Sequence, residues 1–83
     1  MMGEKVVALH GGPTGEARPN EACIRTLEAF LEMARSGEIV GVTMAGLSAD
    51  GCARYALGGV LGGYSIIGAI EMARTELIEL ARE

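Results

Sequence analysis

The stretch from Glu38 to Tyr64 constrains the fold of this 83-residue chain more than any other. Two runs of strand-forming residues, EIVGVTMAGL and CARYAL, lie on either side of Ser48-Ala49-Asp50-Gly51. These four residues match a type I turn with a following bulge, which favours Ser first, Asp third and Gly where the backbone must be left-handed. The sequence therefore predicts an antiparallel β-hairpin centred on this turn.

The register of the hairpin depends on which turn forms. A two-residue turn at Asp50-Gly51 places Tyr55 opposite Gly46, whereas the bulged turn places Tyr55 opposite Ala45. A slip of one residue exchanges the two faces of a strand, so the choice decides which side chains share a face. We favour the bulged turn.

Two helices complete the expected core. The first is predicted from Pro19-Asn20 to Gly37, because Asn20 can cap the first N–H groups and Gly37 can adopt the left-handed conformation that ends a helix. The second is predicted from Tyr64 to Arg82. Both are amphipathic, with one apolar stripe each. The first stripe contains Cys23, Ile24, Leu27, Phe30, Leu31 and Ala34, and the second contains Ile66, Ala69, Ile70, Ala73, Leu77, Leu80 and Ala81.

The N-terminal part is expected to be less regular. Residues 5–10 (KVVALH) form a short strand-prone run, either an edge strand or an arm laid on a partner chain. Residues 11–19 (GGPTGEARP) contain three Gly and two Pro residues, which predicts a connector without regular structure. The predicted fold class is α+β, in the order β-α-β-β-α with both helices packed on the sheet. Residues 1–83 form a single domain, with an arm and connector at 1–19 and a compact core at 20–83.

Composition predicts that copies of the chain associate. Apolar residues make up 49% of the sequence, yet a chain of this size buries only about 60% of the surface that its unfolded form exposes. The remaining apolar surface favours burial between copies, so we expect a homo-oligomer, most simply a two-fold dimer. The apolar run after Lys5 is too short for a signal peptide or a membrane span, which predicts a cytoplasmic protein with no membrane partner.

Charge and residue usage argue against several function classes. The net charge is −4, and the seven Lys and Arg residues do not cluster, so nucleic-acid polymers are not expected as partners. His10 has no acidic or cysteine partner in sequence for a metal site or a catalytic dyad. Cys23 and Cys52 lie in apolar contexts and are expected to be buried thiols, although a disulfide between them stays open. We therefore predict no enzyme, no catalytic residue, no metal site and no cofactor.

The glycine-rich elbow GGVLGGYS, residues 58–65, is the one stretch with a binding mechanism of its own. Glycines before a helix allow backbone N–H groups to converge on a phosphate or carboxylate. The predicted ligand site combines the elbow with side chains brought across a subunit interface: Gly62, Gly63, Tyr64, Ser65, Arg54, Tyr55 and Arg18. The elbow lacks the Lys-Ser/Thr of a phosphate-binding P-loop and has no GxGxxG pattern. The competing interpretation is that the glycines only let a strand turn sharply and pack closely.

Three motifs resemble short, mostly uncharacterised proteins encoded by phages and prophages. These are EAFLEMARSGEIVG at residues 28–41, the Asp50-Gly51 turn and GAIE at residues 68–71. The family pattern is a helix ending A-x-S-G-x-I-x-G, a D-G hairpin and a closing helix with G-A-x-E, and the likeness covers roughly residues 24–75. The chain departs from it in its four-glycine elbow, which no aromatic precedes, and in its N-terminal arm.

The resemblance implies a small protein acting in the cytoplasm of a bacterial host. It makes a counter-defence role plausible, in which a homo-oligomer sequesters a nucleotide immune signal. The alternative is an interaction protein that binds and inhibits a host protein through apolar surface such as Ile67, Ile78 and Met33. No catalytic residue is implied.

Overall fold

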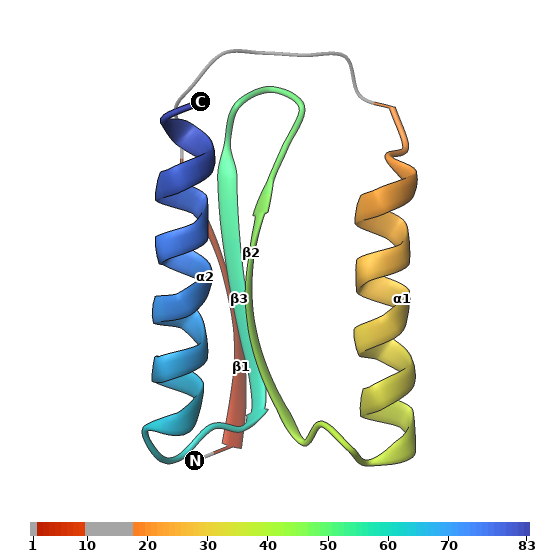
Figure 1. Ribbon diagram of the computed structural model, residues 1–83. Coiled ribbons are helices and arrows are strands. Elements are labelled where there is room, and N and C mark those ends of the chain that lie inside the picture. Colours follow the sequence, from red (N-terminus) through yellow and green to blue (C-terminus); the bar gives the residue numbers. More distant parts are fainter. Residues whose placement is uncertain (1, 10–17) are drawn as a thin grey trace.

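The computed structural model describes residues 2–9 and 18–83. Its elements are, in chain order, β1 (Met2–Leu9), α1 (Glu21–Ser36), β2 (Gly41–Leu47), β3 (Ala53–Val60) and α2 (Ser65–Ala81). The strands form one antiparallel sheet in the order β1-β3-β2, so β3 is central. In Figure 1 the strands form a narrow column between α2 on the left and α1 on the right. This confirms the α+β class and shows the N-terminal run as an edge strand.

The β2–β3 turn has the geometry that its sequence predicts. Gly51 has a φ of 87°, and its N–H donates to the carbonyl oxygen of Ser48 over 3.0 Å. The carboxylate of Asp50 accepts a 3.0 Å hydrogen bond from the backbone N–H of Cys52. Tyr55 pairs with Ala45. The bulged turn is therefore correct, and the register with Tyr55 opposite Gly46 does not occur.

Local capping groups define both ends of α1. The side chain of Asn20 accepts a 3.0 Å hydrogen bond from the N–H of Cys23. At the other end Gly37 has a φ of 86° and donates its N–H to the carbonyl oxygen of Ala34. A neutral acceptor and a left-handed glycine thus satisfy backbone groups that the helix leaves unpaired. Both predicted ends of this helix are confirmed.

The sheet presents two different faces because side chains alternate along each strand. One face, the α1 face, contains Val6, Val42, Met44, Ala56 and Gly58, together with Glu4 on β1 and Arg54 near the hairpin turn. Val42, Met44 and Gly58 line a cavity with residues of α1, which places α1 over this face. The opposite face includes Thr43, Tyr55 and Leu57. The sheet is therefore the layer that separates the two helices (Figure 1).

Packing between helices and sheet is looser than the sequence predicts. Among the elements that the structure describes, close backbone contacts are concentrated between the strands. No apolar side chain is buried in the part of the chain where side chains are described: Leu27 is 51% exposed and Phe30 is 45% exposed. The stripe of α2 is also open, with Leu77 at 62%. A single copy therefore leaves its apolar surfaces unpaired.

The expectation of buried cysteines is wrong. Cys23 is exposed on the open stripe of α1, and Cys52 is half-buried just after the hairpin turn. The two are not joined, so the disulfide that the sequence left open does not form. Burial fails because it depended on a close fit between α1 and the sheet. Most of the predicted connector, like His10, lies outside the described residues.

Candidate functional site

The predicted binding elbow lies at the end of the molecule opposite the hairpin turn. Gly62 to Ser65 joins the end of β3 to the start of α2, at the bottom of Figure 1. Gly63 has a φ of 101°, and a Cβ added there would meet no atom within 4 Å. Its backbone conformation, rather than close packing, is therefore what requires glycine.

The N-terminal end of α2 is open to solvent and has no side-chain cap. Tyr64 occupies the N-cap position, is 88% exposed and makes no capping hydrogen bond through its side chain. Ser65 is the first helical residue rather than the cap, and the first turn contains no acidic residue. The first N–H groups of a helix have no acceptor within it and carry a partial positive charge. The elbow thus presents uncompensated donors to an anion.

The other glycines of the stretch serve packing. Gly59 has a φ of 89°, and a Cβ there would overlap the carbonyl oxygen of Val40. A Cβ on Gly41, its partner in β2, would overlap the carbonyl oxygen of Val60. The N–H of Val60 donates to the carbonyl oxygen of Val40 over 2.9 Å. Close strand packing therefore explains Gly59, whereas it does not explain Gly63.

The side chains predicted to complete the site lie far from the elbow in one chain. Arg54 and Tyr55 lie near the start of β3, and the strand runs on for six residues from Arg54 to Val60 before the elbow, about 20 Å at the usual rise. They also point to opposite faces of the sheet. Arg18 precedes α1, whose first turn lies at the hairpin end of the molecule (Figure 1). The predicted residues thus form two groups at the two ends of the molecule.

The hairpin end carries charges of both signs. The backbone N–H of Cys52 is the main cause that lowers the pKa of Asp50, and the nearby positive charge of Arg54 adds to it. The carboxylate also holds the turn closed through the same N–H. Asp50 is therefore explained by its turn, and its charge partly offsets that of Arg54.

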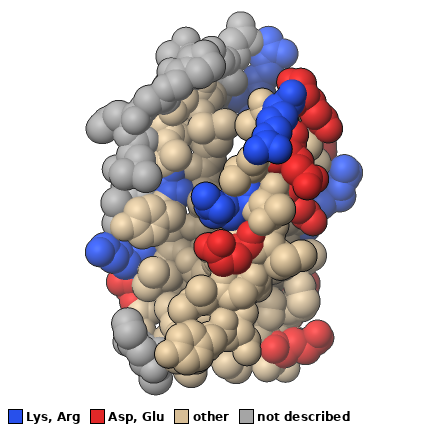
Figure 2. Space-filling model, turned by 60° about the vertical axis from the view of Figure 1, so that its left-hand side comes forward, with Lys and Arg blue, Asp and Glu red and all other residues tan. Residues whose placement is uncertain are grey.

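Charge is distributed unevenly along the face that contains α2. Figure 2 shows acidic and basic side chains mostly in the upper part of this face, whereas uncharged residues fill most of its lower part. The view is turned about the vertical axis, so the lower part is the end at which the elbow lies. The charged side chains visible in the lowest part are acidic, so on this face an anion at the elbow would depend on backbone amides rather than on basic side chains.

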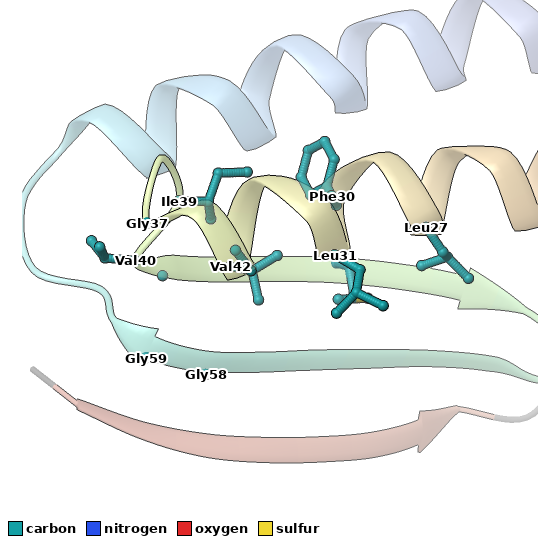
Figure 3. A pocket seen from close by; sticks show the side chains of 12 residues that line it. Leu27, Phe30, Leu31, Gly37, Ile39, Val40, Val42, Gly58 and Gly59 are labelled. Carbon is teal, nitrogen blue, oxygen red and sulfur yellow. The ribbon is translucent and has the colours of Figure 1, made fainter.

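A second candidate surface, which sequence reasoning missed, is an apolar cleft between α1 and the sheet. It has a volume of about 730 Å³, and none of the described residues that line it is charged. We call it the α1 cleft; it is lined by Leu27, Phe30, Leu31, Ala34, Gly37, Ile39, Val40, Gly41, Val42, Met44, Gly58 and Gly59. Figure 3 shows side chains of α1, of the segment before β2 and of β2 around it. The amphipathic pattern of α1 predicted one wall, but not the space beneath it.

Two kinds of feature are absent from the described part of the chain. There, no three His, Cys, Asp or Glu residues are grouped so that they could hold a metal ion. Of the helices described, neither has the length and apolar character needed to cross a membrane.

The ion pair between Arg35 and Glu32, 3.4 Å long and exposed on α1, is an ordinary surface contact.

No known protein family, curated protein or solved structure gives a significant match to this chain.

Proposed function

We propose that this chain is a non-enzymatic binding protein that acts as a homo-oligomer and holds a small anionic ligand between its subunits. The observation that carries the proposal is the open N-terminal end of α2, where Gly63 leaves the first amides accessible and neither a side-chain cap nor an acidic residue competes with a ligand. The free N–H groups and the helix dipole both favour negative charge at this position.

The need for more than one subunit follows from the positions of the candidate residues. In one chain the elbow and Arg54 lie at opposite ends of β3. A two-fold axis across the strands would place the elbow of one copy against the hairpin end of the other. The guanidinium of Arg54 would then face the anion, while Tyr55 and Arg18 would lie at the same end. The exposed apolar surface of the single chain favours such an association.

A nucleotide is the ligand class that fits these groups best. Backbone amides and a guanidinium both bind phosphate, and the guanidinium does so in a bidentate manner. An aromatic ring such as that of Tyr55 can stack on a planar base. With the resemblance to short phage proteins, this suggests sequestration of a nucleotide immune signal in a bacterial cytoplasm.

Isothermal titration calorimetry tests the proposal directly. The purified oligomer is titrated with cyclic and linear nucleotides, and adenosine serves as a control that has the base without the phosphate. We expect micromolar or tighter binding of at least one nucleotide and none of adenosine. If no nucleotide binds at micromolar concentration, the proposal fails.

A protein-binding function is the second candidate, and the exposure of α2 favours it. Ile67 is 55% exposed and Ile78 is 36% exposed, and both lie outside the main stripe of α2. Met33 is only half-exposed, so it adds less apolar surface for a protein partner than the sequence suggested. A pull-down from bacterial lysate, with Ile67→Glu as a comparison, separates the two functions. A host protein retained by the wild type and lost with the variant would favour the second.

A further inference from the structure

The α1 cleft is too apolar and too open to remain exposed in a single chain. Its volume of about 730 Å³ is lined by α1, the segment before β2, and β2 and β3. The walls include Leu27 at 51% exposure and Leu31 at 47%. An adjoining hollow over β1 and β3 extends this surface across the sheet to Val6, which is 74% exposed, and Glu4 and Lys5 of β1 also line it. The α1 cleft and this hollow thus adjoin on the α1 face, with apolar residues at the cleft and charged residues toward β1.

The total surface of the chain shows how much such a contact could bury. The chain exposes 6927 Å², whereas a folded monomer of 8.6 kDa exposes about 4700 Å². Its radius of gyration is 14.0 Å, compared with about 12 Å for a compact domain of this length. The excess is about 2200 Å² per copy and is shared between the α1 face and the open stripe of α2. A pair that buried half of it on each copy, about 2200 Å² in total, would reach the range of obligate dimer interfaces.

The chemistry of the α1 cleft favours a second copy over a small ligand. The lining side chains among the described residues are all apolar, while a small-molecule site normally adds a few polar groups that fix the orientation of its ligand. The charged residues of α1 lie on the side of the helix away from its apolar stripe: Glu21, Arg25, Glu28, Glu32 and Arg35. An apolar surface that lacks charged groups at its centre is typical of interfaces between identical subunits.

We infer that the α1 cleft is the dimer interface: its open side closes against the same surface of a second copy around a two-fold axis. Each copy then covers the part of its partner's α1 face, around Val6, that the partner's own α1 leaves open. The inference rests on the homo-oligomer of the proposed function and identifies which surface forms it. Gly59 at the end of β3 lines the α1 cleft and the elbow follows β3 directly. The start of α2 would therefore lie at the edge of this interface, toward the hairpin end of the second copy.

Sedimentation equilibrium and native mass spectrometry of the wild-type chain give the first test. We expect a dimer, or a larger assembly built from dimers, at micromolar concentration. Phe30→Glu places a charge in the α1 cleft and should shift the dissociation constant at least about a hundredfold toward monomer. Met72→Glu is the matched control, because Met72 is 67% exposed on α2 and lines neither cavity. It should leave the assembly unchanged.

Thiol labelling provides a second test that does not require Phe30→Glu to fold. Ala34→Cys lines the α1 cleft and Met72→Cys does not; both are made with Cys23 and Cys52 replaced by Ser. In the dimer the Ala34→Cys thiol should react at least about tenfold more slowly than the Met72→Cys thiol. Equal labelling rates would overturn the inference.

Other outcomes separate the inference from the proposed function. A wild-type monomer, including one that holds a bacterial protein or a hydrophobic compound in place of a second copy, overturns the inference. A folded Phe30→Glu variant that remains a dimer and still binds nucleotide also overturns it, while the proposed function stands. A dimer that closes at the α1 cleft but binds no nucleotide upholds the interface and rejects the ligand.

Discussion

Gly41 lies opposite Gly59 in the β2–β3 register, and neither position has room for a side chain. A Cβ on Gly41 would overlap the carbonyl oxygen of Val60, and a Cβ on Gly59 would overlap the carbonyl oxygen of Val40. The pair lies where the sheet meets the segments that lead from α1 and toward α2. These two glycines therefore set how closely the backbones approach where the sheet meets the segment from α1 and the segment that leads to α2.

Replacing Gly59 with Ala should destabilise the fold by about 2 kcal/mol or more, since strain at a positive φ adds to the overlap with Val40. Gly46→Ala is the matched control, because Gly46 lies in β2 with no atom within 4 Å of an added Cβ and with an ordinary φ. It should be neutral or slightly stabilising. Urea unfolding measures both, and equal losses would show that close approach is not the cause.

Asn20→Ala should cost about 1 kcal/mol, because the N–H of Cys23 loses its acceptor at the start of α1. Asn20→Asp keeps an acceptor and adds a charge that favours this end of the helix, so its stability should equal or exceed that of the wild type. Far-UV circular dichroism during urea unfolding measures the difference. An alanine variant as stable as the aspartate variant would contradict the capping role.

Acid should weaken the hairpin turn through Asp50. Hydrogen bonding to the N–H of Cys52 lowers the pKa of Asp50 in the folded state. Its stabilising contribution is therefore present above the unfolded pKa of about 3.9, and it is lost as the pH falls through the lower folded pKa. The stability difference between wild type and Asp50→Asn should shrink from pH 6 to pH 2. A constant difference over this range would contradict the prediction.

Ser65→Glu should lower the affinity for a nucleotide at least about tenfold, because a carboxylate at the start of α2 competes for the same amides and repels the anion. The same carboxylate favours the helix dipole, so loss of fold is not expected to cause the loss of binding. Ser65→Gln is the uncharged control and should bind within about threefold of the wild type. Calorimetry compares the three proteins. If Ser65→Glu binds nucleotide with unchanged affinity, the elbow is not the binding site.

Mixed oligomers test whether the site spans two subunits. Arg54→Ala and Ser65→Glu should each abolish most binding on their own. When the two variants are unfolded together and refolded as a mixture, a dimer that joins one intact elbow to one intact Arg54 should restore about a quarter of the sites. Separately refolded samples serve as the control. If the mixture binds no more than its components, both groups act within one chain or Arg54 takes no part.

Features determined by neighbouring residues could be predicted from the sequence. Asn20 and Gly37 end α1, and Ser48 to Gly51 fixes the hairpin register, because each depends on hydrogen bonds within a few residues. The height of α1 above the sheet depends on tertiary packing, which no local pattern encodes. For that reason the exposure of Cys23 and the α1 cleft were not predicted.

The candidate site was predicted only in part. The positive φ of Gly63 and the helix start without a side-chain cap agree with the sequence pattern, while anion binding at this elbow stays a prediction. Arg54 lies far from the elbow because the two are at opposite ends of β3. Choosing residues by their ligand-binding chemistry alone does not reveal this separation. The packing role of Gly59 required the strand register, which brings Val40 against it.

The pairing of β1 with β3 also determines the order of events during folding. Leu9 pairs with Ala53 and Met2 pairs with Val60, so these contacts join residues that are distant in the sequence. The β2–β3 hairpin closes a much shorter loop, and loop-closure entropy favours its earlier formation. We expect β1 to join last, along the edge of β3 that the hairpin leaves unpaired. Until then that edge is available to any other extended strand.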